Sequence, residues 1–421
     1  MSTAVCVDVG STYTKACGVD LASGRLLARS EVPTTAGSDV LAGVDEAVGA
    51  VGGGDALYVC SSAGGGLRLA VVGYEALVTA EAGHRVGLSA GARVVHVAAG
   101  PLDGRAVAAL RAARPDVILL VGGTDGGDEE TLRHNAGRLA TSRMRVPVVV
   151  AGNAAAAPDA GRVLSGRGVP VTVTANVLPR IGVLEPGPAR AAIREVFLHH
   201  VIGGKKLSRG TRFASLVRCA TPDAVLAGVS VLADVTAAGV LVVDVGGATT
   251  DVYSALVPDA ELTHGPQADV AGTLWRSRTV EGDLGVGVGA PGVVAAASAE
   301  KLPAPDIAAG RPFNAGTDRA LACAAAAIAV RRHARGHSPG PGQPRTGGRD
   351  LRDVRLVVGS GGVLRHGGGD AVLDAVLGDT AGGWVLPRAA RRVIDTEYVL
   401  AAAGLLAEDH PDAAAALVNS L

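Results

Sequence analysis

Aromatic residues are scarce in this 421-residue chain, because phenylalanine, tryptophan and tyrosine together make up only 2% of it. Proteins that bind single-stranded nucleic acid stack bases on aromatic side chains, so this composition offers little for such binding. Cysteine is also rare, with five residues and no CxxC spacing among them. This argues against a disulfide framework or a zinc site and predicts a protein of the reducing cytoplasm.

Long apolar runs and an excess of one charge are missing as well. No segment approaches the roughly 20 uninterrupted apolar residues of a membrane-spanning helix, and the formal net charge is −1. The N-terminus leads directly into a predicted strand that carries Asp8, so we expect no signal peptide. We therefore expect neither nucleic acid nor a membrane as a partner. The P-loop motif GxxxxGKS/T is absent too, which excludes the P-loop NTPases.

Two segments that lie far apart in the chain share one pattern. Val5–Lys15 and Leu241–Asp251 each consist of a run of β-formers, an aspartate, and a turn rich in glycine and hydroxyl residues. A buried strand of this kind brings its carboxylate to the carboxyl end of a sheet, where it can hold Mg²⁺ or its water shell. The glycines allow backbone N–H groups to approach phosphate oxygens. Together the two turns predict two lobes that bind a triphosphate from both sides.

A third segment, Val354–Val363, is again a strand that runs into a glycine turn. Such turns also simply connect strands and helices in α/β proteins, and this plainer interpretation stays open for any one of the three. Three in this order, two of them with an aspartate at the strand end, favour nucleotide binding. The order resembles that of the actin/Hsp70/sugar-kinase superfamily, in which two phosphate loops precede an adenosine loop.

This pattern assigns a role to the residues of the three turns. Asp8 and Asp244 are the predicted catalytic carboxylates. Both are expected to bind Mg²⁺ through water, and Asp244 to orient the attacking water. For Asp8, a strand-end aspartate that caps the following turn is the alternative. The residues expected to bind ATP are Gly10, Ser11, Thr12, Thr14 and Lys15 in the first turn, Gly246, Gly247, Ala248, Thr249, Thr250 and Asp251 in the second, and Gly359, Ser360, Gly361 and Gly362 in the third.

With that resemblance, the apolar segments predict an α/β fold: a two-lobed actin-like (ribonuclease H-like) ATPase fold with an inserted doubly wound parallel α/β block in the first lobe. Residues 1–66 begin the first lobe, and 67–180, where short apolar strands alternate with helices, form the inserted block. Residues 181–204 are a helical connection, and 205–421 form the second lobe. Within it, 335–350 contain no large apolar residue and many prolines and glycines, which predicts a flexible surface loop.

One further turn follows a predicted strand at the carboxyl edge of the inserted sheet, where ligands tend to bind. It consists of Gly122, Gly123, Thr124, Asp125, Gly126 and Gly127. The acidic residues 128–130 occupy the positive end of the next helix, so a cation or the basic face of a partner suits this turn better than a phosphate. A tight turn with an N-cap is the alternative.

Several blocks of the sequence are long and specific. They are Asp8–Lys15, Ser61–Arg68, Leu119–Gly127, Val146–Asn153, Thr174–Val177, Val242–Asp251 and Thr279–Gly285. Together they resemble the glutamate mutase accessory protein family (GlmL/MutL). The resemblance implies an actin-like ATPase, with ATP and Mg²⁺ as cofactors, that reactivates or assists adenosylcobalamin-dependent glutamate mutase or a related cobalamin mutase. The mutase subunits would be its partners, and lobe movement driven by the nucleotide would do the work.

Two other functions stay open at this point. A small-molecule kinase of the same superfamily would need a base aimed at an acceptor hydroxyl, and the sequence offers no candidate beyond Asp8 and Asp244. A weakly hydrolysing, nucleotide-dependent assembly protein would be expected to form polymers. The chain has no Asp-x-His-x-x-Gly motif for cobalamin, because Leu132 stands where the aspartate before His134 would be needed.

Overall fold

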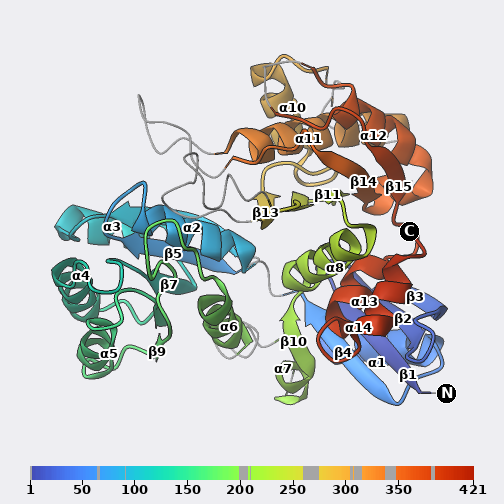
Figure 1. Cartoon of the computed structure of the whole chain (residues 1–421). Coiled ribbons are helices and arrows are strands. Elements are labelled where there is room, and N and C mark those ends of the chain that lie inside the picture. Colours follow the sequence, from blue (N-terminus) through green and yellow to red (C-terminus); the bar gives the residue numbers. More distant parts are fainter. Residues whose placement is uncertain are drawn as a thin grey trace. The chain divides into compact units, whose positions relative to one another are not determined.

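The computed structural model describes residues 2–63, 67–90, 92–198, 207–208, 210–258, 275–303, 307, 315–336, 348–380 and 385–421. The chain divides into two compact units. The first contains Met1–Ala224, and the second contains Val225–Val257 and Trp275–Leu421. The first unit runs from blue to green in Figure 1, and the second from yellow-green to red.

The first unit begins with a mixed five-stranded sheet. Its strands are β1 (Thr3–Val9), β2 (Tyr13–Asp20), β3 (Leu26–Pro33), β4 (Ala56–Ser61) and β10 (Val217–Ala220), in the order β10-β4-β1-β2-β3. β1, β2 and β3 are antiparallel neighbours, whereas β4 runs parallel to β1 and β10 runs parallel to β4. Helix α1 (Val40–Ala50) buries its apolar side in the same core as β1. Its first turn is capped by the side chain of Asp39, which accepts a hydrogen bond from Leu41 N.

The segment between β4 and β10 builds a second sheet, in which all strands are parallel. Its strands are β5 (Arg68–Gly73), β6 (Arg93–Ala99), β7 (Val117–Leu120), β8 (Val148–Val150) and β9 (Val171–Val173), in the order β6-β5-β7-β8-β9. The helices between and after them are α2 (Thr79–Ser89), α3 (Gly104–Ala112), α4 (Glu130–Thr141), α5 (Ala157–Ser165), α6 (Gly187–Val196) and α7 (Arg212–Leu216). β7 and β8 are buried along their whole length, as the central strands of a parallel sheet covered on both faces must be.

The second unit is entered through helix α8 (Thr221–Thr236) and contains the third sheet. Its strands are β11 (Gly239–Val245), β12 (Thr250–Ala255), β13 (Arg276–Glu281), β14 (Val354–Ser360) and β15 (Arg391–Ile394), in the order β13-β12-β11-β14-β15. Helices α10 (Ala290–Ala299), α11 (Ala315–Arg335) and α12 (Gly369–Leu377) share a core with β11. Helices α13 (Val399–Leu406) and α14 (Pro411–Val418) end the chain.

The first and third sheets have the same topology. In each, three antiparallel strands follow one another in sequence, and two later strands add parallel to the first strand. The expected mixed α/β fold is therefore confirmed, and the parallel sheet lies between the fourth strand and the last strand of the first sheet.

One boundary differs from the sequence prediction. Strand β10 falls within 205–421, the range predicted for the second lobe, but it pairs with β4 and completes the first sheet. β10 has four residues and follows a long insertion, so apolar spacing alone does not show which sheet it joins. Residues 337–347 of the predicted loop 335–350 and 199–204 of the connection 181–204 lie outside the described residues. Among the helices of the described ranges, none has both the length and the apolar character needed to cross a membrane.

Candidate nucleotide-binding site

Asp8 lies near the carboxyl end of β1, and its side chain is half-buried. Its Oδ1 atom accepts a hydrogen bond of 2.5 Å from Thr221 Oγ1, at the start of α8, and one of 3.7 Å from Cys60 Sγ on β4. Burial, reinforced by the nearby Asp8, raises the pKa of the Cys60 thiol well above its ordinary value. The thiol therefore stays protonated and donates. Sequence reasoning missed Thr221 and Cys60, because nothing in their local sequence marks them as partners of Asp8.

The turn after Asp8 is closed by a hydrogen bond of 3.0 Å from Gly10 N to Tyr13 O. A Cβ atom at Gly10 would lie 2.8 Å from Tyr13 O, so this position requires glycine. Ser11 and Thr12 are exposed at the tip of the turn, where a ligand can reach them.

Thr14 and Lys15, also predicted to contact phosphate, lie deeper than the tip. Thr14 is fully buried, and its Oγ1 lies 3.0 Å from Thr34 Oγ1, which donates to Gly10 O over 2.9 Å. Thr14 thus supports the turn through Thr34, which bonds to the backbone of Gly10. Lys15 lies directly opposite Asp8 in the β1–β2 ladder, on the same face of the sheet.

The second turn repeats this geometry in the other unit. Asp244 lies near the end of β11, and Gly246 N donates to Thr249 O over 2.9 Å. Gly247 and Ala248 are exposed at the tip, while Thr249 is half-buried.

Two other residues of this hairpin, Thr250 and Asp251, are buried or already form an ion pair within the protein. Thr250 is fully buried, and its hydroxyl has no hydrogen-bond partner in the part of the chain that the structure describes. Asp251 lies opposite Asp244 in the β11–β12 ladder and forms an ion pair of 3.1 Å with Arg278 on β13. Burial raises the pKa of Asp251, and the Arg278 guanidinium opposes that rise. Arg278 thus compensates the negative charge of Asp251, whose carboxylate lies directly opposite that of Asp244.

A loop after β13 supports the second turn from behind. Val286 N donates to Gly246 O over 3.1 Å, and Gly287 N donates to Gly247 O over 2.8 Å. A Cβ atom at Gly285 would lie 2.5 Å from the carbonyl carbon of Ala248, so only glycine permits this approach.

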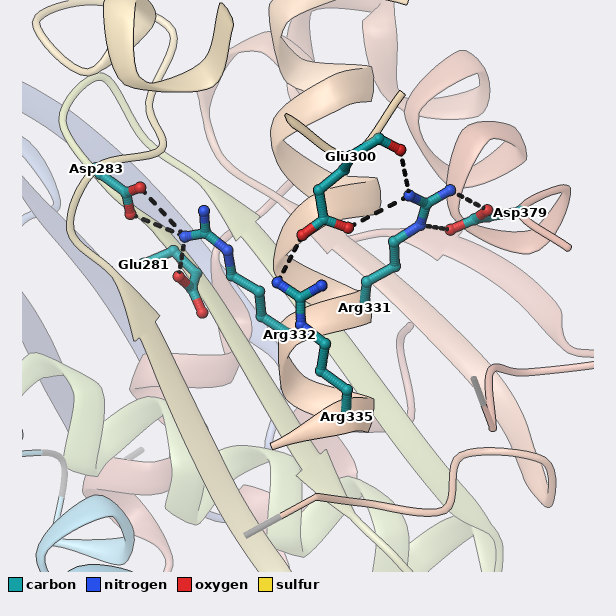
Figure 2. A network of polar contacts seen from close by, with 7 residues as sticks. All are labelled: Glu281, Asp283, Glu300, Arg331, Arg332, Arg335 and Asp379. Atoms are coloured by element: carbon teal, nitrogen blue, oxygen red, sulfur yellow. Dashed lines mark hydrogen bonds and ion pairs between the residues drawn. The ribbon is translucent and has the colours of Figure 1, made fainter. Parts of the chain in front are cut away.

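Ion pairs from the last turn of α11 hold this loop in place (Figure 2). Arg332 Nη1 lies 2.6 Å from Glu281 Oε2 and 3.0 Å from Asp283 Oδ1, at the beginning of the loop. Arg331 and Arg335 contact a separate pair of carboxylates, Glu300 and Asp379. The sequence block Thr279–Gly285 includes Glu281 and Asp283, but no sequence signal indicated Arg332 as their partner.

The third turn meets the second at the carboxyl end of the same sheet. Ser360 lies beside Asp244 in the parallel ladder of β11 and β14. Gly361 has a φ of +101°, and a Cβ atom there would lie 2.1 Å from Val245 O, so the close contact of the two turns depends on this glycine. A Cβ atom at Gly362 would meet nothing within 4 Å, which leaves this backbone open to a ligand. Gly359, in contrast, is packed against Leu364 and Ile394.

The turn 122–127 is fixed by two buried asparagines from the segments that follow β8 and β9. Asn153 Nδ2 donates to Thr124 O over 2.8 Å, and Asn176 Nδ2 donates to Asp125 Oδ1 over 2.9 Å. Asp125 Oδ1 also accepts from Ala154 N over 2.9 Å, and Asp128 Oδ2 accepts from Thr131 N in the first turn of α4 over 3.1 Å. The two aspartates that a cation would use therefore already have partners within the protein. In the described ranges, no group of three or more histidine, cysteine, aspartate or glutamate side chains is arranged to hold a metal ion.

The predicted residues thus form two groups, one at the carboxyl edge of the central strands of each unit. Each group consists of a strand-end aspartate followed by a tight glycine turn that exposes its tip, and the second group also contains the third turn. The fold and these groups define an α/β protein of two compact units with a repeated carboxylate–glycine hairpin.

Comparison with known proteins gives this class a family. The model of the MutL protein family matches residues 4–421. Protein MutL of Clostridium tetanomorphum is 35% identical over 453 residues, which cover 98% of this chain and 97% of the relative. The chain therefore belongs to the MutL protein family, and the family resemblance expected from the sequence is confirmed.

Solved structures similar to this chain have low TM-scores. Component A of (R)-2-hydroxyglutaryl-CoA dehydratase from Acidaminococcus fermentans has a TM-score of 0.31 and 9% identity, with 99% of this chain and 97% of that chain covered. A carbohydrate kinase from Novosphingobium aromaticivorans has a TM-score of 0.33 and 15% identity, with 98% and 92% covered.

Proposed function

We propose that this protein binds and hydrolyses Mg-ATP and uses the nucleotide cycle to reactivate or assist an adenosylcobalamin-dependent mutase, with glutamate mutase as the first candidate. One observation carries the nucleotide part of this proposal. On two sheets of the same topology, the same strand carries an aspartate one residue before its end, and the same hydrogen bond closes the turn after it, from Gly10 to Tyr13 and from Gly246 to Thr249. This repeat of both topology and turn supports the proposal that each unit contributes one phosphate-binding turn.

The geometry of each turn suggests which part of the nucleotide it contacts. The exposed hydroxyls of Ser11 and Thr12 and the exposed backbone of Gly247 and Ala248 are placed to contact phosphates. Gly362, whose backbone is open on the side where a Cβ would stand, suits the adenosine.

Mg²⁺ fits the chemistry of these groups, because carboxylate and hydroxyl oxygens are the ligands it prefers. Asp8 and Asp244 would hold it through water, and the bound ion would neutralise charge that develops on the phosphates. Thr14 and Asp251 support the turns in this scheme, since both already have protein partners.

Membership in the MutL family supports the accessory role. The mutase is the partner that the resemblance to glutamate mutase accessory proteins implies, and its identity is open to direct measurement.

The test is phosphate release from Mg-ATP by the purified chain, with and without glutamate mutase that has been inactivated by damage to its cobalamin. We expect stimulation by the inactive mutase, together with recovery of mutase activity. Asp8→Asn and Asp244→Asn should each reduce phosphate release by about 100-fold. Asp353→Asn is the matched control, because the side chain of Asp353 is 96% exposed just before β14.

Other outcomes would contradict the proposal. Unchanged release in both Asp8→Asn and Asp244→Asn would remove the nucleotide assignment. A phosphorylated small molecule would indicate a kinase, and polymers that depend on ATP would indicate an assembly protein. Release that is indifferent to the mutase would leave the nucleotide assignment in place and remove this partner.

A further inference from the structure

The hydrogen bond between Thr221 and Asp8 joins two residues that are 213 positions apart. The sheet order explains how they meet. Asp8 lies beside Cys60 in the β1–β4 ladder, and Cys60 lies beside Cys219 in the β4–β10 ladder. The chain leaves β10 at Ala220, so the next side chain, that of Thr221, is brought to the edge where Asp8 ends its strand.

Thr221 is also the first residue of α8. Pro222 follows it, and proline in the first turn of a helix fixes the backbone where the helix begins. The boundary between the two compact units falls between Ala224 and Val225, within the first turns of this helix. The contact to Asp8 is therefore made by the residue at which the chain starts to leave the first unit.

The two hydrogen bonds to the Asp8 side chain act on one oxygen atom. Thr221 Oγ1 and Cys60 Sγ both donate to Oδ1, and among the described residues no donor to Oδ2 is found. A hydroxyl that donates to a carboxylate at 2.5 Å forms a charge-assisted hydrogen bond, which is stronger than one between neutral groups. It fixes the plane of the carboxylate and leaves Oδ2 to accept a hydrogen bond from a water of a hydrated cation.

We propose that Thr221 is a positioning residue: its hydroxyl orients Asp8 toward the water shell of Mg²⁺ and couples the state of the nucleotide site to the start of α8. This inference rests on the proposed function. It also predicts a direct energetic link between Thr221 and Asp8 that exists without any nucleotide.

The first arm of the test measures this link in the absence of ATP. Urea unfolding midpoints are compared for the wild-type chain, Thr221→Val, Asp8→Asn and the double variant. Valine keeps the shape of threonine and removes its hydroxyl. We expect Thr221→Val to lower the midpoint in the wild-type background and to have a clearly smaller effect when Asp8 is already asparagine. Asparagine keeps Oδ1 as an acceptor but removes the charge, so additive shifts would show that the charge of Asp8 does not strengthen this contact and would overturn the inference.

The second arm measures the Mg²⁺ concentration that gives half-maximal binding of a fluorescent ATP analogue, without reliance on turnover. We expect Thr221→Val to raise this concentration about tenfold, with the affinity for the analogue in EDTA unchanged. Thr221→Ser, which restores the hydroxyl, should return it close to the wild-type value. Thr236→Val is the matched control, because its hydroxyl donates within α8, to Leu232 O and Ala233 O.

The outcomes separate this inference from the proposed function. If Thr221→Val binds Mg-nucleotide as the wild type does, or if valine and serine impair binding equally, the positioning role is refuted while nucleotide binding stands. If the wild-type chain binds no Mg-nucleotide, the proposed function fails and the role of Thr221 fails with it, even where the first arm detects the contact.

Discussion

Replacement of Arg332 by glutamine should weaken the second unit and its glycine hairpin together. Arg332 is the residue that contacts both Glu281 and Asp283, at 2.6 and 3.0 Å (Figure 2). Glu281 is 8% exposed, so the variant leaves a nearly buried carboxylate without its guanidinium. Loss of one partner from a buried ion pair costs about 3–5 kcal/mol. The Arg332 side chain is 24% exposed, which admits water and lowers the expected loss to about 2 kcal/mol.

The pH dependence of this loss follows from the protonation of Glu281. Burial raises the pKa of Glu281, and the Arg332 guanidinium opposes that rise, so the pKa should rise further in Arg332→Gln. Glu281 is ionised in the unfolded chain above about pH 4.5, and the variant must therefore bury an uncompensated charge at neutral pH. Once the pH falls below that value, Glu281 is protonated in both the folded and unfolded states. The difference from wild type should then be small, and it should be full at pH 7.

Fluorescence of Trp275, which lies just before β13 in the second unit, can measure this in a urea titration. The signal therefore follows that unit and not the whole chain, which matters because multi-unit proteins do not unfold in one step. Arg352→Gln is the matched control, since Arg352 forms an exposed ion pair with Asp350 that is worth at most about 1 kcal/mol. Arg332→Lys should recover part of the loss.

On the proposed function, the same variant should also weaken binding of Mg-ATP, because the loop after β13 donates backbone hydrogen bonds to the second glycine turn. Equal stability of Arg332→Gln and wild type at pH 7 would refute the reasoning. So would a loss that is as large at pH 4 as at pH 7, because it would then arise from packing and not from the buried carboxylate.

Two further variants test the second unit. Gly361→Ala should lower the unfolding free energy of this unit by at least about 2 kcal/mol, because alanine is strained at a φ of +101° and its Cβ would meet Val245 O at 2.1 Å. Gly362 has open space around it, so Gly362→Ala should change the unfolding free energy by no more than about 0.5 kcal/mol. Equal effects of the two variants in urea titrations would contradict the close contact at Gly361. Burial lowers the pKa of His333 to about 3. In the unfolded chain this histidine is protonated below about pH 6.5, whereas in the folded chain it stays neutral down to about pH 3. The stability should therefore fall as the pH drops from 6.5 toward 3. Between pH 6.5 and 5 the wild type should therefore lose stability faster than His333→Gln, and parallel profiles would show that His333 does not cause the loss.

The hairpins were predictable from sequence because their signals are local. A run of β-formers predicts a strand, and the aspartate and glycine turn that follow predict where the strand ends and the chain reverses. All of this lies within eleven residues in Val5–Lys15 and in Leu241–Asp251. The alternation of short apolar strands with helices likewise predicted the inserted parallel block. In each case the conformation is decided by residues that are neighbours in the chain.

The partners of the hairpins were not predictable, because they come from elsewhere in the chain. Thr221 reaches Asp8 only because β10 joins the first sheet beside β4, and that pairing is set by sheet order and not by local spacing. Arg332 reaches Glu281 across 51 residues of sequence, from a helix whose apolar pattern predicts only its buried side. Side chains that position a site therefore become visible only when the order of the strands is known.

These partners also distinguish two hairpins that share one backbone geometry. Asp8 is held by a hydroxyl and a protonated thiol, which are neutral donors. Asp251 is held by the buried guanidinium of Arg278, which compensates its charge inside the unit. A carboxylate that keeps its charge attracts a hydrated cation, whereas one already compensated contributes mainly to the fold. Burial and charge therefore favour Asp8 over Asp251 as a ligand to the water shell of Mg²⁺, although both residues stand beside the same kind of glycine turn.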